Sequence, residues 1–165
     1  MNKLWNQIEG FNENEPWGQP EKMNGLAVML LAHIRQWFRN KHGESVTIVL
    51  HCGYEETGHA SDSQHAWKLR DHKSRMVGGT IGNAEDFHFK GLDHLTFSQQ
   101  ASEMLECLGD LQVLSVVGLG IYPTWNTKGF HVDVRGYPAR WGFVNGKAVK
   151  IGEALAYAVG QEGGV

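Results

Sequence analysis

Apolar residues recur at intervals of three and four positions in a long stretch near the start of the chain, a spacing typical of an amphipathic helix. The stretch runs from Glu21 to about Asn40, and Pro20 and Gly43 flank it as start and stop signals. Its apolar positions are Met23, Leu26, Ala27, Leu30, Ile34 and Phe38. We therefore expect a helix that packs one face against a core.

A second helix is expected after Thr96, because Thr96 and Gln99 have the spacing of a capping box. Gly109 is expected to close its C-terminus. The apolar face of this helix is formed by Ala101, Met104, Leu105 and Leu108. A short last helix is expected over residues 152–159.

Strands are predicted where β-branched and aromatic residues gather in short runs. Asn145-Gly146 is a strong hairpin-turn signal inside the last of these runs. The predicted strands are Ser45–Tyr54, Phe87–Lys90, Val113–Tyr122 and Gly129–Gly136, followed by a hairpin over Trp141–Ile151. Because helices and strands do not alternate strictly, we expect an α+β fold with a small, mainly antiparallel sheet flanked by helices.

The chain of 165 residues has the length of a single domain. Residues 1–20 are expected to form an N-terminal arm, because Asn12 to Pro20 is polar and rich in turn formers. Residues 55–80 are polar and show little periodicity, which is more typical of a functional loop than of a core element.

Composition excludes several classes of protein. With 41% hydrophobic and 20% charged residues the chain is expected to be globular, and a formal net charge of -3 offers no broad cationic surface for nucleic acid. The two cysteines form no C-x-x-C pair, so neither a disulfide scaffold nor a Cys-rich zinc site is expected. No apolar run approaches the roughly 20 residues needed to span a bilayer, so we expect neither a signal peptide nor a membrane span. We expect the chain to be made in the cytoplasm.

Histidines point to the chemistry, since seven of the nine fall between His42 and His94. A further histidine lies in the predicted strand Gly129–Gly136, where alternation places His131, Asp133 and Arg135 on one face. The segments Ser63-Gln64-His65 and Gly82–His88 add an imidazole and a carboxylate, the ligand types of a catalytic zinc. Trp125 and Trp141 flank this strand and either form the walls of a site or fill the core.

Three motifs of the chain carry a resemblance to a known family: Ser63-x-His65, Gly82-x-Ala84-x-Asp86 and His131-x-Asp133-x-Arg135. They resemble the motifs of the D-alanyl-D-alanine carboxypeptidase and L-alanyl-D-glutamate endopeptidase superfamily, which includes VanY- and VanX-type enzymes and phage endolysins. Gly118–Pro123 and Ala139–Trp141 are similar to the C-terminal part of a phage-associated branch. The resemblance covers about residues 45 to 142 and implies a hedgehog/D-Ala-D-Ala-peptidase-like fold.

The resemblance also implies roles for individual side chains. The implied ligands of Zn²⁺ are His65, Asp86 and His131. Asp133 is then the candidate general base, and Arg135 or Tyr122 the candidate group that stabilises the oxyanion. Zinc would polarise the scissile carbonyl and lower the pKa of a bound water to about 7.

Two departures from the family pattern affect these roles. About twenty residues separate His65 from Asp86, so residues 66–81 form an insertion that must loop out, and His59 or His72 could be the ligand in place of His65. Glu55 replaces an arginine found in many relatives, and Lys128 stands where VanY-type enzymes carry a catalytic Glu.

The charge reversal at Glu55 leaves two alternatives for substrate recognition. A substrate carboxylate would have to be bound by Arg135, Arg140 or a lysine. Otherwise the enzyme is an endopeptidase whose substrate presents no free carboxylate at this position.

The expected function is that of a monomeric zinc metallopeptidase that acts at the bacterial cell wall. It would hydrolyse peptide bonds of peptidoglycan stem peptides, as a carboxypeptidase or an endopeptidase. The resemblance also implies a phage origin. The alternative is a non-catalytic wall-binding or phage structural domain that retains the peptidase fold. A third interpretation is a metal-free domain in which the histidines are incidental.

Overall fold

The computed structural model describes residues 8–54, 69–70, 76–77 and 83–163. A six-stranded sheet has the strand order β1-β4-β6-β5-β7-β8, and a separate pair consists of β2 (Leu69–Arg70) and β3 (Met76–Val77). The strands of the large sheet are β1 (Thr47–Cys52), β4 (Ala84–Lys90), β5 (Gly118–Tyr122), β6 (Gly129–Asp133), β7 (Ala139–Val144) and β8 (Lys147–Lys150).

All neighbouring strands of this sheet run antiparallel except β5 and β7, which are parallel. The helices of the described part are α1 (Gly25–His42), α2 (Phe97–Asp110) and α3 (Ile151–Glu162), preceded by a short 3₁₀ turn, η1 (Pro20–Lys22). The predicted α+β class with a mainly antiparallel sheet is therefore confirmed.

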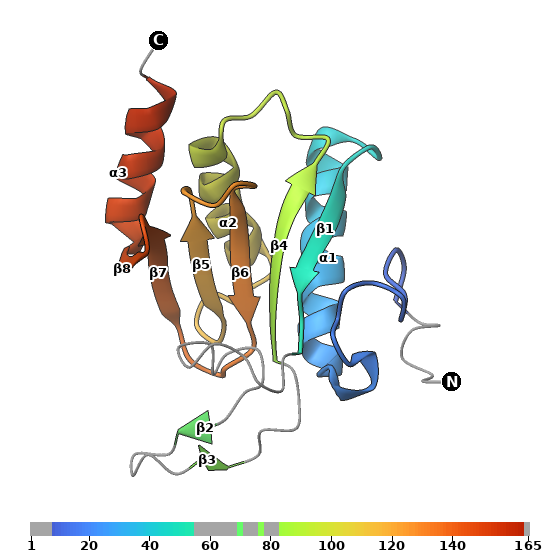
Figure 1. Cartoon of the computed structure of the whole chain (residues 1–165). Coiled ribbons are helices and arrows are strands. Elements are labelled where there is room, and N and C mark those ends of the chain that lie inside the picture. Colours follow the sequence, from blue (N-terminus) through green and yellow to red (C-terminus); the bar gives the residue numbers. More distant parts are fainter. Residues whose placement is uncertain (1–7, 55–68, 71–75, 78–82, 164–165) are drawn as a thin grey trace.

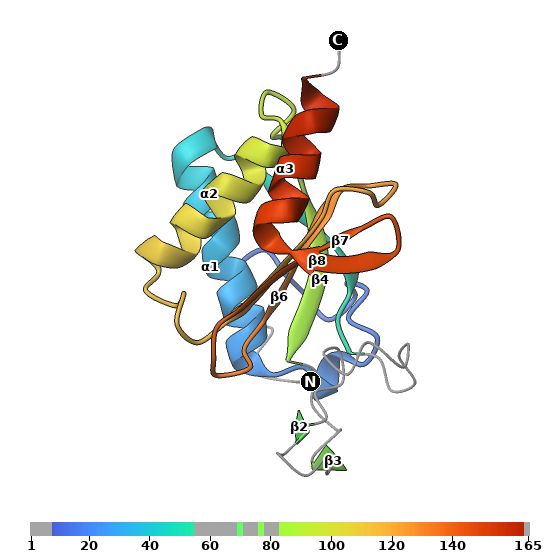
Figure 2. The same cartoon turned by 90° about the vertical axis from the view of Figure 1, so that its left-hand side faces the viewer.

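Helices α1 and α2 cover one face of the sheet, as the two views in Figures 1 and 2 agree. Helix α3 lies on the same face over β7, where a Cβ atom at Gly142 would come within 2.1 Å of the Ala154 Cβ. Gly142 therefore permits the close approach of helix and strand. In the described part of the chain no helix covers the opposite face of the sheet (Figure 1), which is called the open face below.

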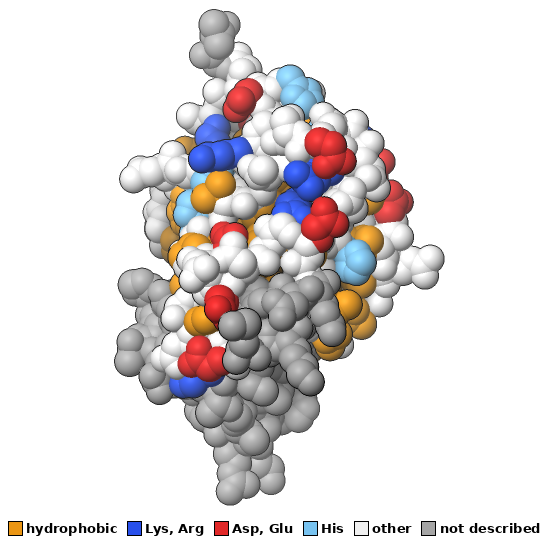
Figure 3. Space-filling model, turned by 90° about the vertical axis from the view of Figure 1, so that its right-hand side faces the viewer, with side chains coloured by type: hydrophobic (Ala, Val, Ile, Leu, Met, Phe, Trp, Pro, Cys, Tyr) orange, Lys and Arg blue, Asp and Glu red, His pale blue; other side chains and the backbone are white. Residues whose placement is uncertain are grey.

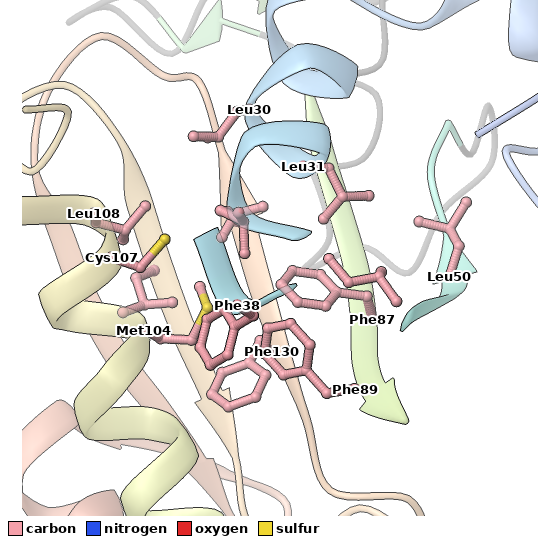
Figure 4. Close-up of a cluster of buried hydrophobic side chains, with 14 of the residues drawn as sticks. Leu30, Leu31, Phe38, Leu50, Phe87, Phe89, Met104, Cys107, Leu108 and Phe130 are labelled. Atoms are coloured by element: carbon pink, nitrogen blue, oxygen red, sulfur yellow. The ribbon is translucent and has the colours of Figure 1, made fainter. Parts of the chain in front are cut away.

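The core lies between the sheet and the helices. Figure 4 shows aromatic rings from α1, β4 and β6 in contact, with aliphatic and sulfur-containing side chains of α1 and α2 around them. The ring centroids of Phe38 and Phe89 are 4.2 Å apart, and those of Phe87 and Phe130 are 5.8 Å apart. Because Phe87, Phe89 and Phe130 occupy the inner face of β4 and β6, the neighbouring positions of both strands face outward.

Residues ahead of α1 also pack on the domain. The Trp17 side chain is fully buried, and its Nε1 donates a hydrogen bond to the carbonyl of Asn12 at 2.7 Å. The backbone N–H of Tyr54 donates to the carbonyl of Trp17 at 2.7 Å. This segment therefore fixes the position of the residues that follow β1.

Element boundaries differ from the prediction at several points. Helix α1 begins at Gly25 because the Asn24 side chain accepts a hydrogen bond from the backbone N–H of Leu26 and caps the helix. In α2 the Thr96–Gln99 capping box is confirmed, but the prediction that Gly109 ends the helix is wrong. The helix continues to Asp110, and Gln112 with a φ of 58° takes the left-handed position instead.

The strands also shift at their ends. β4 begins at Ala84 and is longer than predicted, whereas β5 begins only at Gly118 because Val113 and Val116 are joined in a turn. The hairpin turn is confirmed, since Asn145 and Gly146 have φ angles of 49° and 79°, both positive as a type I′ turn requires.

The surface over α1 and β1 agrees with the modest net charge. Figure 3 shows basic and acidic side chains interspersed on this side of the molecule. Among the residues described, no helix is both long and apolar enough to cross a lipid bilayer.

Candidate metal centre on the open face

Strands β4 and β6 place Asp86 directly opposite His131. Residues paired in this way across antiparallel strands point to the same face, here the open face. The Oδ1 atom of Asp86 lies 2.8 Å from Nδ1 of His131. Both side chains are buried, and His131 is fully enclosed.

A second carboxylate contacts the other side of the same imidazole ring. Oδ2 of Asp133 lies 3.0 Å from Nε2 of His131, two residues along β6 on the same face. Arg135 donates from Nε to Oδ1 of Asp133 at 2.6 Å and from a terminal nitrogen to Oδ2. His131, Asp133 and Arg135 therefore form one connected row, as the alternation along this strand predicts.

Glycines on the neighbouring strand β5 make room for this row. A Cβ atom at Gly118 would come within 2.3 Å of the Asp133 carboxylate, and one at Gly120 would come within 2.7 Å of the Trp141 ring. These two glycines alternate along β5 and share its open face. Sequence reasoning did not assign them a role, although the Gly-x-Gly spacing inside a strand was the available signal.

Aromatic rings border the row on the sides of β5 and β7. The ring centroids of Trp141 and His131 are 5.1 Å apart, and the Arg135 guanidinium lies 5.0 Å from the centroid of Trp141. Tyr122 meets His131 edge-on at 6.5 Å and stacks on Trp125 at 4.0 Å. Neither tryptophan belongs to the hydrophobic core, and both rings lie on the open face.

The two carboxylates control the protonation of His131. Burial alone would lower the pKa of His131, but the charges and hydrogen bonds of Asp86 and Asp133 outweigh burial and raise the pKa to about 9. Burial raises the pKa of Asp133, but hydrogen bonds from His131 and Arg135 outweigh this effect and lower the pKa to about 2. Without metal, a protonated imidazole thus lies between two carboxylates.

A third carboxyl group nearby was missed by sequence reasoning. Glu85 pairs with Val132 and so faces the core, where it is fully buried. Within the described residues its two oxygens have no hydrogen-bond partner, and burial raises its pKa well above the usual value. Burial therefore favours the neutral form of the Glu85 carboxyl group, which lies on the core side of β4, next to Asp86 in sequence.

The pair Asp86–His131 fits two positions of a zinc centre. Zinc–ligand bonds of about 2.0–2.2 Å at tetrahedral angles place neighbouring donor atoms roughly 3.3 Å apart. Oδ1 of Asp86 and Nδ1 of His131 are 2.8 Å apart, so the two atoms must move slightly apart to bind one zinc ion. The third implied ligand, His65, lies outside the described residues, as do its alternatives His59 and His72. The described ranges by themselves contain no group of three side chains that could hold a metal ion.

Comparisons with protein-family models, with curated proteins and with solved structures find no match to this chain.

The other predicted site residues have specific partners. Arg140 donates hydrogen bonds to the carbonyl oxygens of Leu114, Val117 and Ala139, so its guanidinium is part of the scaffold. Tyr122 is buried beside His131. The insertion 66–81 and Glu55 belong to the segment that the structure describes only at β2 and β3.

Proposed function

We propose that this chain is a zinc-dependent peptidase that hydrolyses peptide bonds of peptidoglycan stem peptides. The observation that carries the proposal is the 2.8 Å contact between Asp86 and His131, two residues 45 positions apart in sequence. They are the two zinc ligands that the family resemblance implies within the described residues. A carboxylate and an imidazole in contact on one face are suited to a catalytic zinc that keeps an open coordination position.

When bound, zinc would supply a Lewis acid for the scissile carbonyl. In this arrangement Asp86 and His131 hold the ion, and Trp141 and Tyr122 exclude water from the sides of the imidazole. The open face would receive the peptide, because the helices occupy the other face (Figure 2).

The contacts of Asp133 support an orienting role rather than the role of general base. Its two oxygens accept hydrogen bonds from Arg135 and His131, and its pKa is lowered to about 2, so it is a weak proton acceptor. A carboxylate that holds the second nitrogen of a metal-binding histidine fixes the tautomer and the orientation of the ring. We assign this role to Asp133, with Arg135 as its anchor.

The bonding of Asp133 also favours a second candidate function. With this carboxylate engaged and Lys128 in the position of the family's catalytic Glu, the chain could be a non-catalytic domain that binds the wall without cutting it. Such a domain would still bind zinc.

Mass spectrometry of purified peptidoglycan incubated with the zinc-loaded protein separates the two functions. A peptidase releases new stem-peptide termini, and His131→Ala abolishes the release, whereas a matched exposed variant, His94→Ala, leaves it intact. Sedimentation of the protein with intact peptidoglycan and no new termini would instead establish the wall-binding domain.

A further inference from the structure

A pair of histidines lies on the open face apart from the Asp86–His131 contact. Nε2 of His51 and Nδ1 of His88 are 2.7 Å apart, and their ring centroids are 4.7 Å apart. His51 belongs to β1 and His88 to β4, which are adjacent antiparallel strands. The two imidazoles are therefore brought together by the pairing of the sheet.

An irregularity in β1 explains how His51 reaches its partner. The register of β1 and β4 shifts between Leu50 and Cys52, so that His51 is the extra residue of a β-bulge. Bulges re-aim a side chain and are frequent beside functional sites. His88 itself pairs with Val49, and the bulge turns His51 toward it.

An aromatic side chain supports the same pair. The Trp125 ring meets His51 edge-on, with centroids 6.2 Å apart and planes at 79°. A Cβ atom at Gly129 would lie 3.5 Å from the Trp125 ring, so this tryptophan lies over the first residue of β6. The His51 ring therefore has a defined position although the side chain is exposed.

We propose that His51 and His88 form a second transition-metal site, distinct from the Asp86–His131 centre. Imidazole nitrogen is a favoured ligand of zinc, copper and nickel. The two nitrogens need to separate from 2.7 Å to roughly 3.3 Å to share a tetrahedral ion, a change that the exposed His51 ring can make by side-chain rotation. Water completes the coordination shell on the solvent side.

The position of the pair makes it a separate site. His88 and Asp86 lie two residues apart on the same face of β4, a step of about 6.5–7 Å. This exceeds the separation of about 3.5–4 Å at which two metals act on one bond. The second ion would therefore occupy the same open face beside the first site, and would be bound more weakly because only two protein ligands hold it.

Zinc stoichiometry tests the proposal directly. Isothermal titration of the metal-free chain with zinc is expected to show one equivalent more for the wild type than for His51→Asn or His88→Asn. The matched control is His33→Asn, at an exposed position of α1 outside either pair of contacting histidines. His33→Asn is expected to retain the wild-type stoichiometry.

The wild type and the His51 and His88 variants share the same Asp86–His131 centre, so the difference of one equivalent reports on the second site alone. Failure of the second site is therefore distinguishable from failure of the Asp86–His131 centre. A wild-type stoichiometry that His51→Asn and His88→Asn leave unchanged, at sub-millimolar free zinc, overturns the second site. Copper provides another readout, because Cu²⁺ bound at the pair quenches Trp125 fluorescence. The part of the quenching that Trp125 contributes is expected to disappear in His88→Asn and in Trp125→Phe, with circular dichroism used to verify folding.

Discussion

The Nε2 atom of His131 lies 3.0 Å from Oδ2 of Asp133, while Nδ1 of the same ring faces Asp86. The imidazole is thus held at both nitrogens by carboxylates from two different strands. Because Asp133 is itself held by Arg135, one side of the ring is anchored to the scaffold and the other side is available to a metal shared with Asp86.

Asp133→Asn tests whether Asp133 orients the His131 ring for metal binding at its other nitrogen. The amide has nearly the shape of the carboxylate but removes the charge that orients and polarises the ring, so zinc affinity is expected to fall about 10- to 100-fold with the fold retained. Isothermal titration with zinc measures the change. Asp93→Asn, at an exposed position, serves as control, and equal zinc affinity in Asp133→Asn and wild type would remove the orienting role.

The metal-free protein is expected to lose stability as pH rises. The pKa of His131 is raised from 6.5 to about 9 in the folded state, so its contribution is fully present below pH 6.5 and is lost between pH 6.5 and 9. The contribution amounts to at most a few kcal/mol. Urea unfolding between pH 6 and 10 measures it.

The matched variant for this measurement is His131→Asn, whose stability is expected to vary less over the same pH range. Zinc requires the neutral imidazole, so zinc addition is expected to abolish the pH dependence. A metal-free wild type whose stability rises from pH 6.5 to 9 relative to His131→Asn would contradict the charged state assigned to this ring.

Gly118→Ala is expected to disturb the site, because its Cβ atom would meet the Asp133 carboxylate at 2.3 Å. The expected loss in the free energy of unfolding is about 1–3 kcal/mol, with weaker zinc binding. Gly160→Ala in α3 is the matched control, since a Cβ there meets nothing within 4 Å and alanine favours the helix by about 0.5–1 kcal/mol. Equal stability of the two variants would show that Gly118 has no such steric role.

The sequence predicted the kinds of element well because helix caps, hairpin turns and apolar spacing are local signals. Thr96 with Gln99 and the Asn145-Gly146 turn are clear cases. The face shared by His131 and Asp133 followed from strand alternation alone. By contrast, the start of β5 could not be predicted, since a local turn at Val113 competes with the apolar run.

Local sequence signals could not predict which residues of distant strands lie next to each other. Periodicity gives no register for β4 against β6, so only the family resemblance brought Asp86 and His131 together before the structure did. Glu85 was missed because the predicted strand began at Phe87, and only the longer strand places Glu85 in line with the inward-facing Phe87 and Phe89. The bulge that turns His51 toward His88 likewise depends on strand pairing.

Zinc content after exhaustive dialysis against metal-free buffer tests the central claim most directly. Elemental analysis of the wild type loaded with zinc is expected to show one tightly held equivalent, which is lost in both Asp86→Asn and His131→Asn and kept in His94→Asn. A wild type that retains less than half an equivalent, or zinc that remains after both site substitutions, would contradict a metal centre at Asp86 and His131.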